Sequence, residues 1–213
     1  MRLILASSSP RRRDLIASLG IPFTVVRPDI NEDIRPDESP IAYVERLSRE
    51  KAAAVAASLG EPDVVLAADT IVLAADTAGA TGDGALLGKP ADAAEARAML
   101  RLLREHPHTV HTAFALMRGG GSGPIYAERV ETRVTMRPYS DAEIDAYIAT
   151  GDPFDKAGGY AIQHNGFSPV ARIDGCYTNV VGLPLCAVKR ALAQAGFAVD
   201  APARCDCAVF TLS

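Results

Sequence analysis

The residues of this sequence that are best suited to chemistry are cations and carboxylates. The set consists of Arg11, Arg12, Lys51, Lys89 and Lys156 on the cationic side and Glu32, Asp69 and Asp155 on the acidic side. Arginines and lysines around a helix N-terminus suit a polyphosphate, because unpaired backbone N–H groups there also attract anions. A few carboxylates among them suit a divalent cation, and one carboxylate can act as a general base for water.

The absence of other catalytic patterns narrows this chemistry. No Ser-His-Asp arrangement or activated cysteine stands out, which favours attack by activated water over a covalent intermediate. No Gly-x-x-x-x-Gly-Lys-Ser/Thr loop occurs, which argues against a P-loop motor or switch. The residues by themselves indicate an α/β enzyme that handles phosphate.

The opening segment, residues 3–20, predicts the structure that would hold a phosphate. A short apolar run predicts a strand, three serines follow it, and Pro10 suits the first position of a helix capped by Ser9. Gly20 is expected to end this helix. Arg11–Arg13 crowd its first turn, where the helix dipole disfavours positive charge, so we expect an anion to compensate them. The alternative is a solvated basic turn.

Asp69 interrupts a nearly continuous apolar run at residues 63–76, a pattern typical of a buried strand. A carboxylate inside a core strand is costly unless it is paired, bound to a metal or catalytic. Asp69 is therefore the candidate for function. Asp76, at the end of the same run, is interpreted as a turn residue because a glycine- and threonine-containing stretch follows it.

A helix is expected from Ser39-Pro40 to about Leu59, closed by Gly60. Its apolar stripe contains Lys51 at a position where a hydrophobic residue is expected. In one reading, this lysine extends from the margin of the stripe into water. In the sharper alternative, Lys51 faces an anion in a cleft.

Other segments alternate between strands and helices. Strands are expected at 23–26, 109–117, 125–136 and 169–173, and helices at 92–104, at 140–151 behind a capping box, and at about 185–195. Residues 155–163, which contain Gly158-Gly159, predict a tight turn that leads into a strand. Residues 209–212 would add an edge strand or a packing segment.

Composition limits the location and partners. The chain has 213 residues, 48% of them hydrophobic, and a net charge of −4, which fits a globular protein and argues against non-specific binding to nucleic acid. No apolar run is long enough to cross a bilayer, and the first residues lack the layout of a signal peptide. We therefore expect a cytoplasmic protein with no nucleic-acid or membrane partner.

Two groups of potential metal ligands are interpreted as incidental. The four cysteines do not resemble a secreted disulfide framework; these are Cys176, Cys186, Cys205 and Cys207. The pair in Cys205-Asp-Cys207 has no evident partner residues with which to bind a metal. Three histidines are expected on a loop that leads into a strand, with no carboxylate or thiolate at a spacing that zinc would need. They are His106, His108 and His111.

Six short motifs occur in order along the chain. They are Ala6-Ser-Ser-Ser-Pro-Arg-Arg12, Arg49-Glu-Lys51-Ala52, Ala68-Asp-Thr70, Gly88-Lys-Pro90, Asp155-Lys-Ala-Gly158 with Gln163, and Val181-Gly-Leu-Pro184. Each is weak alone, but the ordered set resembles the Maf family of nucleoside triphosphate pyrophosphatases, once described as septum formation inhibitors. The resemblance covers roughly residues 2–195. It implies a single Maf-like domain with two lobes at residues 1–197, followed by a C-terminal tail at 198–213.

The resemblance implies an α/β fold of the inosine-triphosphate-pyrophosphatase type, with an elongated mixed central sheet, flanking helices and a cleft between two lobes. It implies hydrolysis of a nucleoside triphosphate between the α and β phosphates, which gives a nucleoside monophosphate and pyrophosphate. It also implies a divalent metal cation, Mg²⁺ or Mn²⁺, and a homodimer.

The resemblance assigns roles to individual residues. Asp69 matches the family's proton acceptor, and Glu32 matches an acidic position near the metal or attacking water. The expected catalytic set is Asp69, Lys51, Lys89 and Glu32, with Glu32 and Asp69 as metal ligands. The phosphate-facing positions are Ser7, Arg11, Arg12, Lys51 and Lys89. The positions tied to substrate choice are Arg12, Thr70 and Gln163. Asp155 and Lys156 are further candidates for substrate binding, and Asp155 either binds substrate or only orients Lys156.

The stretch that ends at Gln163 resembles the family branch that acts on dTTP and UTP, whereas the 7-methyl-GTP branch lacks this glutamine. A glutamine amide can both donate to and accept from the carbonyl and N–H edge of a pyrimidine ring. Gly159 and His164-Asn-Gly-Phe-Ser-Pro169 depart from the family's commoner pattern here. These departures leave the reaction in place and bear on the preferred base.

Two alternatives to a dTTP/UTP pyrophosphatase stay open. The first is a pyrophosphatase for 7-methyl-GTP or another modified nucleotide. The second is a nucleotide-responsive regulator of cell division with little turnover. A pure sensor would need the phosphate-binding cations but no base to activate water, so Asp69 together with Lys51 and Lys89 favours turnover.

Overall fold

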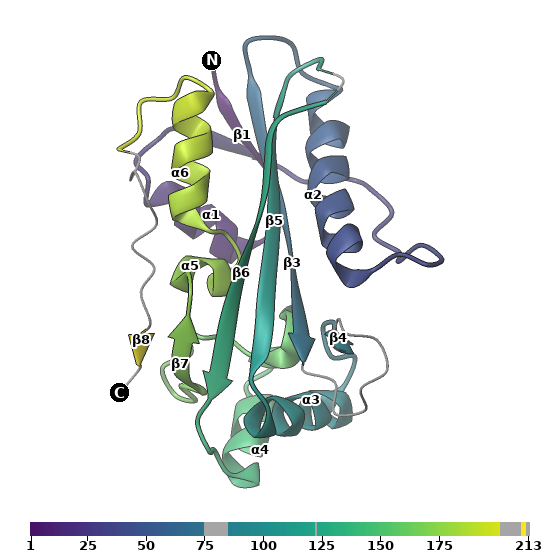
Figure 1. Cartoon of the computed structure of the whole chain (residues 1–213), viewed down its shortest axis with the longest axis vertical. Helices are drawn as coiled ribbons and strands as arrows, with labels where there is room; N and C mark the ends of the chain where they lie inside the picture. Colours follow the sequence, from purple (N-terminus) through teal and green to yellow (C-terminus); the bar gives the residue numbers. More distant parts are fainter. Residues whose placement is uncertain (75–84, 122, 201–209, 212–213) are drawn as a thin grey trace. The chain divides into compact units, whose positions relative to one another are not determined.

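The computed structural model describes residues 1–74, 85–121, 123–200 and 210–211 (Figure 1). In chain order its elements are β1 (Leu3–Ala6), α1 (Pro10–Ala17), β2 (Phe23–Val26), α2 (Pro40–Ala56), β3 (Val64–Ala74), β4 (Ala85–Leu87), α3 (Ala93–Glu105), β5 (His108–Arg118), β6 (Pro124–Met136), α4 (Asp141–Ala149), β7 (Val170–Asp174), α5 (Tyr177–Val181), α6 (Leu185–Gln194) and β8 (Phe210–Thr211). Two 3₁₀ segments, Asp152–Asp155 and Ala157–Gly159, lie between α4 and β7. The interpretations of Asp76 and Cys205-Asp-Cys207 fall outside the described residues.

The strands form one mixed sheet in the order β2-β1-β3-β5-β6-β7-β8, with β4 paired to β3. β1 runs parallel to β2 and β3, whereas β4 with β3, β7 with β6, and β8 with β7 are antiparallel. The predicted α/β class, a mixed central sheet flanked by helices, is confirmed. None of the helices in the described ranges is long and apolar enough to cross a membrane.

The chain divides into two compact units. The first unit comprises Met1–Asp69, the described part of residues 112–130, and the described chain from Gly182 through α6. The second unit comprises the described part of residues 70–111, together with Glu131–Val181 and β8. β3 changes unit between Asp69 and Thr70, so these adjacent candidates belong to different units.

In the first unit, helices cover both faces of the sheet (Figure 1). β1 is buried along its length. Leu3 and Leu5 join the apolar cluster that contains residues of α1 and α6, whereas Ile4 and Ala6 join the cluster that contains residues of α2. Because successive side chains of a strand point to opposite faces, this four-residue strand anchors both helical layers.

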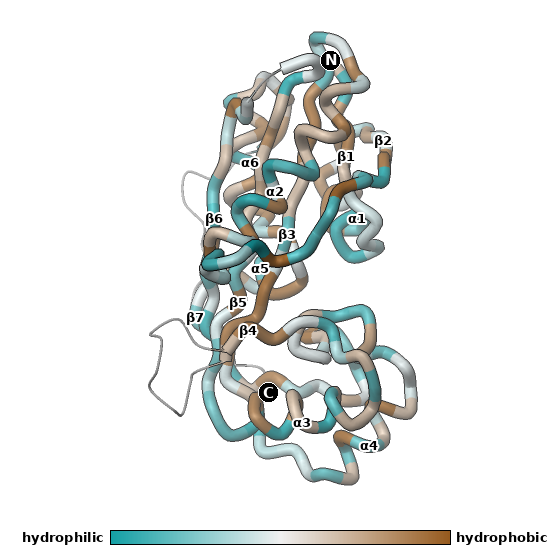
Figure 2. The backbone as a smooth tube through the Cα atoms, turned by 90° about the vertical axis from the view of Figure 1, so that its right-hand side faces the viewer, coloured by the Kyte–Doolittle hydropathy of each residue, from teal (hydrophilic) through white to brown (hydrophobic). Residues whose placement is uncertain are grey.

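The second unit has its own core around α3 and α4. Leu100 and Leu103 of α3, Ile144 of α4 and Tyr139 are buried together in this cluster. The Tyr139 hydroxyl donates to the carbonyl of Leu100 at 2.7 Å, so its polar end is satisfied. The capping box predicted for α4 is confirmed, because the Ser140 side chain accepts from the Glu143 backbone and the Glu143 side chain accepts from the Ser140 backbone. Figure 2 colours the backbone by hydropathy; β5 combines polar and apolar residues and is buried from Val110 to Met117.

The prediction of a loop is wrong for two of the three histidines. His106 follows α3, but His108 and His111 lie within β5 and are buried. His108 Nε2 lies 2.8 Å from the hydroxyl of Tyr160, and the two rings meet edge to face. A histidine that is hydrogen-bonded in this way can occupy a buried strand position as a neutral side chain.

The prediction that residues 155–163 lead into a strand is also wrong. After the second 3₁₀ segment the backbone is irregular, and the next strand is β7. The backbone N–H of Ala161 donates to the hydroxyl of Tyr147 at 3.1 Å rather than to a neighbouring strand. A side chain of α4 thus takes over the hydrogen bond that a sheet would otherwise provide.

Candidate active site

The turn between β1 and α1 is built by serines. Ser7 is buried, and its hydroxyl oxygen accepts a hydrogen bond from the backbone N–H of Ser9 at 3.1 Å. Ser9 caps α1, since its side chain accepts from the backbone N–H of Arg12, and Pro10 opens the helix. The predicted strand, serine turn and helix start are confirmed, and Arg11–Arg13 lie in the first turn as expected.

The serine turn follows the end of β1, whereas Asp69 lies in the middle of the longer neighbouring strand β3. β1 and β3 are parallel, and Ala6 pairs with Ala67. Ser7 follows the first of these alanines directly, and Asp69 stands two residues beyond the second. β1 therefore ends beside the middle of β3, and ligands of open α/β sheets bind at such carboxyl ends of strands.

Lys51 joins two carboxylates in the first unit. Its ammonium donates to Asp69 Oδ1 at 2.7 Å and to Glu32 Oε2 at 2.9 Å. The Lys51 side chain is 8% exposed, the Asp69 side chain 14% and the Glu32 side chain 56%. The reading in which Lys51 extends into water is therefore wrong. Lys51 faces anions, and these are side chains of its own chain.

Arg12 belongs to the same charged group. Its Nε donates to the carbonyl of Gly182 at 2.9 Å, which ties α1 to the segment before α6. Burial lowers the pKa of the Arg12 guanidinium, and the negative charges of Asp69 and Glu32 act in the opposite direction. Part of the anion expected to compensate the arginines of α1 is thus supplied by Asp69 and Glu32.

The segment that carries Glu32 is held by two side chains of α2. The hydroxyl of Tyr43 donates to the carbonyl of Glu32 at 2.9 Å. Arg46 Nη2 donates to the carbonyl of Asp33 at 3.0 Å. Sequence reasoning missed both residues. Arg46 and Glu50 are four residues apart on a helix, which was a signal for an ion pair. It was no signal for a contact with residues 29–38, which are called the acidic segment below.

In the second unit, Lys156 is buried and makes three hydrogen bonds. Its ammonium donates to the carbonyl of Asp152 at 2.6 Å, to Asp152 Oδ1 at 2.9 Å and to Asp155 Oδ1 at 2.5 Å. Asp152 Oδ2 also accepts from the hydroxyl of Tyr147 at 2.6 Å. Because an ammonium has three donors, this arrangement commits Lys156 to the two turns around it. Its role in substrate binding stays a prediction.

Lys89 lies on an exposed segment that touches these turns. The carbonyl of Gly88 accepts from the backbone N–H of Gly158 at 2.9 Å.

Gly158 has φ 72°, and a Cβ added there would lie 3.3 Å from both methyl carbons of Val72. Glycine is thus required for both its backbone conformation and the close approach to β3.

The remaining candidates of the second unit differ in exposure. Thr70 is half-buried in β3, whereas Asp155 and Gln163 are exposed. Tyr177 of α5 packs on the unit's core; burial raises the pKa of its hydroxyl, and the Gln163 side chain acts in the opposite direction. α5 is anchored by Thr132, whose hydroxyl accepts from the backbone N–H of Cys176 at 3.0 Å. Neither Tyr177 nor Thr132 was singled out from the sequence.

Glu32 and Asp69 are the carboxylates that suit a divalent cation here. Mg²⁺ and Mn²⁺ prefer oxygen ligands, and Mg²⁺ is usually held by one or two carboxylates together with substrate phosphates. Among the described residues, no group of three or more His, Cys, Asp or Glu side chains could hold a metal ion. A cation at Glu32 and Asp69 would therefore take further ligands from a phosphate-bearing ligand and water.

Comparison with known proteins covers most of the chain. Residues 2–195 match the Maf-like protein family. A dTTP/UTP pyrophosphatase of Citrifermentans bemidjiense is 49% identical over 194 residues, which cover 91% of this chain and 95% of that protein. A dTTP/UTP pyrophosphatase of Thermomicrobium roseum is 50% identical over 203 residues, which cover 95% of this chain and 88% of that protein. A solved nucleoside-triphosphatase / dITP/XTP pyrophosphatase of Mycobacterium abscessus aligns at 17% identity and a TM-score of 0.38 over 65% of this chain and 76% of that one, a likeness too low to carry an argument.

Proposed function

Because this chain belongs to the Maf family, we propose that it is a nucleoside triphosphate pyrophosphatase that hydrolyses dTTP and UTP to the nucleoside monophosphate and pyrophosphate. The observation that carries the proposal is the Lys51 ammonium bonded to both Asp69 and Glu32. These groups lie beside the end of β1, where the serine turn leads into the arginine-bearing helix α1. Cations close to a carboxylate in the first unit support the assignment of phosphate binding and water activation to this group.

Asp69 is the residue that we assign to activate water. Its carboxylate is mostly buried on β3 and is oriented by the hydrogen bond from Lys51. As the water oxygen forms a bond to the α-phosphorus, Asp69 takes a proton from that water. The bond between the α-phosphorus and the bridging oxygen breaks, and pyrophosphate leaves with that oxygen.

The cations are assigned to the phosphates. Ser7, Arg11, Arg12 and Lys51 would bind phosphate oxygens and offset their charge during the reaction, and Lys89 is assigned the same role. Although burial lowers the pKa of Arg12, a guanidinium in a protein keeps its proton at neutral pH. Arg12 can therefore supply a fixed positive charge.

Glu32 and Asp69 would hold the divalent cation, Mg²⁺ or Mn²⁺. When bound, the cation supplies charge that polarises a phosphoryl oxygen. The protein's part is to keep the two carboxylates close together without a phosphate present. Lys51 does so, because its ammonium bonds to both and reduces the repulsion between them.

Residues of the second unit are assigned to the substrate's identity. Gln163 and Thr70 are assigned to selection of the base, a role also given to Arg12. Asp155 and Lys156 would contribute through the turns that they organise. We also propose that the enzyme works as a homodimer in the cytoplasm, where nucleoside triphosphates are its partners.

The competing proposals differ in measurable ways. Pyrophosphate release from dTTP, UTP, CTP, GTP and 7-methyl-GTP should be measured with Mg²⁺ for the wild type, Asp69→Asn and Asp63→Asn. Asp63 is a matched control, because it is a buried carboxylate paired with Arg2 just before β3. We expect release from dTTP and UTP that is lost in Asp69→Asn and kept in Asp63→Asn.

Other outcomes would redirect the assignment. Preferential release from 7-methyl-GTP would keep the reaction and overturn the role given to Gln163. Nucleotide binding without release from any substrate would contradict the proposal and favour the regulator of cell division. Full activity in Asp69→Asn would overturn the assignment of the general base.

A further inference from the structure

Glu32 lies on a segment between β2 and α2 that contains neither helix nor strand. Its backbone position is set by α2. Tyr43 donates to the carbonyl of Glu32, and Arg46 donates to the carbonyl of the next residue, Asp33. Tyr43 and Arg46 are three residues apart on α2, so they share one face of the helix. Two successive carbonyls of the acidic segment are thus held by one helix face.

Arg46 is itself fixed on three sides. Its Nε and Nη2 donate to the two oxygens of Glu38 at 2.6 and 2.7 Å, and its Nη1 donates to Glu50 at 2.9 Å. The guanidinium also lies 5.5 Å from the centre of the Tyr43 ring. The side chains of Arg46 and Glu38 are only 12% and 8% exposed. This is the geometry of a forked arginine–carboxylate pair, which a lysine cannot reproduce.

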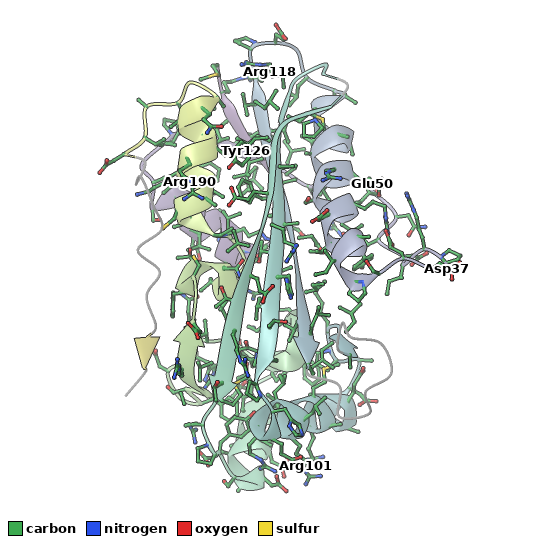
Figure 3. The ribbon with its side chains drawn as sticks, viewed as in Figure 1. Asp37, Glu50, Arg101, Arg118, Tyr126 and Arg190 are labelled. Carbon is green, nitrogen blue, oxygen red and sulfur yellow. The ribbon has the colours of Figure 1, made fainter. Side chains whose placement is uncertain are left out.

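The hydrogen bonds of Arg46 and Glu38 also hold the part of the acidic segment that leads into α2. Glu38 also accepts from the backbone N–H of Arg35 at 3.1 Å, and Arg35 Nη2 donates to Glu50 at 2.6 Å. Figure 3 shows Glu50 on α2 and Asp37 at the tip of the segment, away from the helix. The tip therefore projects outward while the part with Glu32 is bound to α2 through Tyr43 and Arg46.

We propose that Arg46 and Tyr43 are positioning residues that hold the Glu32 carboxylate beside Lys51 and Asp69 and so set the affinity of this pair of carboxylates for a divalent cation. This inference rests on the proposed function for its catalytic consequence, but not for its structural one. Lys51 alone cannot supply the same constraint, because it bonds only to the end of a side chain that is 56% exposed. Holding the backbone removes the freedom that such a side chain would otherwise have.

The pair of Arg46 and Glu38 is suited to a permanent role. The hydrogen bond from Arg46 lowers the pKa of Glu38 to about 2, so the carboxylate stays ionised throughout the range in which enzymes are assayed. The Arg46 guanidinium is charged over the same range. The contact is thus a fixed support and not a pH-dependent switch.

The catalytic consequence is tested by a double-mutant cycle. The variants are Arg46→Met, Glu32→Gln and their combination. Arg190→Met is a matched control, because Arg190 of α6 pairs with Glu128 of β6 and, like Arg46, forms an ion pair with a glutamate. We expect Arg46→Met to raise the Mg²⁺ concentration for half-maximal dTTP hydrolysis by about tenfold or more, with little change in the KM for dTTP. In the Glu32→Gln background the same change should have almost no further effect. Equal effects of Arg46→Met in both backgrounds would overturn the proposal.

A second readout does not depend on turnover. Mn²⁺ binding should be measured by electron paramagnetic resonance in the presence of a dUTP analogue with an imido group between the α and β phosphates. Amide hydrogen exchange should be measured over residues 31–38. We expect Arg46→Met to bind Mn²⁺ about tenfold more weakly and to exchange its amide hydrogens faster over residues 31–38. Arg46→Lys should partly restore the affinity and the slow exchange. Arg190→Met should have the affinity and the exchange rate of the wild type. Tyr43→Phe should also weaken Mn²⁺ binding and speed up amide exchange, by less than Arg46→Met does.

The proposed function and the positioning role of Arg46 can fail separately. If the wild type releases pyrophosphate from no nucleotide, the proposed function fails, while exchange over residues 31–38 still tests the support given by α2. If the wild type is active but Arg46→Met binds Mn²⁺ as tightly as the wild type, the positioning role is wrong and the proposed function stands.

Discussion

Lys51 and Asp69 are 18 residues apart in the sequence, and their Nζ and Oδ1 atoms lie 2.7 Å apart in the structure. One residue belongs to α2 and the other to β3, so the ion pair joins a helix to the sheet beneath it. Each residue breaks the apolar pattern of its own element, and each break is explained by the other. An ion pair with so little exposure is costly to separate, because removal of one partner leaves a charge in a poorly hydrated site.

Substitution of Lys51 by methionine should therefore abolish most activity while the fold persists. Methionine keeps the length and apolar stem of lysine, so packing of α2 is largely preserved. Asp69 and Glu32 would then lose the ammonium that bonds to both and would repel each other until a divalent cation binds. We expect kcat/KM for dTTP to fall by about 10²-fold or more, measured as pyrophosphate release. Lys51→Arg should keep more activity, and a fully active Lys51→Met would contradict the role given to this lysine.

Gln163 should control the choice between pyrimidine bases. Its side chain acts on the pKa of the Tyr177 hydroxyl, so Tyr177 is the neighbour expected to influence how the amide is presented to a substrate. We expect Gln163→Ala to lower kcat/KM for UTP by about tenfold or more and to reduce the preference for UTP over CTP. Tyr177→Phe should reduce the preference with a smaller loss of rate. Unchanged ratios of UTP to CTP hydrolysis in both variants would show that the base is read elsewhere.

Signals within single helices and strands made most of the fold predictable, together with Lys51 and Asp69 of the candidate site. Ser9, Pro10 and the capping box at Ser140 and Glu143 act within one turn of helix, and each is where the sequence predicted it. Asp69 and Lys51 were identifiable because a charged residue in an apolar pattern needs a partner. What the pattern could not supply was the partner's identity.

The features that were missed all depend on contacts between distant segments. Arg46 reads as an ordinary helix residue with an ion pair four positions away, and only the folded chain shows that it holds the carbonyl of Asp33. The same is true of Tyr147, whose hydroxyl replaces a strand partner for Ala161. His108 was misplaced because β5 begins at His108, one residue before the predicted strand at 109–117, with Tyr160 supplying the polar contact.

Gly158 should be required for stability, whereas Gly88 should not. Gly158 has φ 72°, and a Cβ there would press on Val72, whereas a Cβ at Gly88 would meet no atom within 4 Å. We expect Gly158→Ala to lower the free energy of unfolding by about 1–3 kcal/mol and Gly88→Ala to change it by less than about 1 kcal/mol. Urea unfolding of the two variants is the measurement. Equal stabilities would show that the 3₁₀ turns can shift away from β3 at little cost.

His108 should make the protein less stable as the pH falls from neutral. Burial lowers the pKa of His108 to about 3 in the folded protein, while the unfolded chain has the ordinary value of about 6.5. Between these values the unfolded state binds a proton that the folded state does not, so stability is complete above about pH 6.5 and decreases as the pH falls toward 3. The neighbouring hydroxyl of Tyr160 stays neutral over this range, because burial raises its pKa.

The comparison with His108→Gln isolates this effect. Glutamine can still hydrogen-bond Tyr160 but does not titrate, so its melting temperature should respond less to pH. Between about pH 7 and pH 5.5 the wild type should lose about 1 kcal/mol more stability than the variant. The carboxylates that support the helices do not obscure the difference, because the pKa of Glu38 and that of Glu143 are lowered to about 2 and both proteins share them. If both proteins lose the same stability over this interval, His108 is accessible to protons in the folded state and its burial in β5 is not maintained in solution.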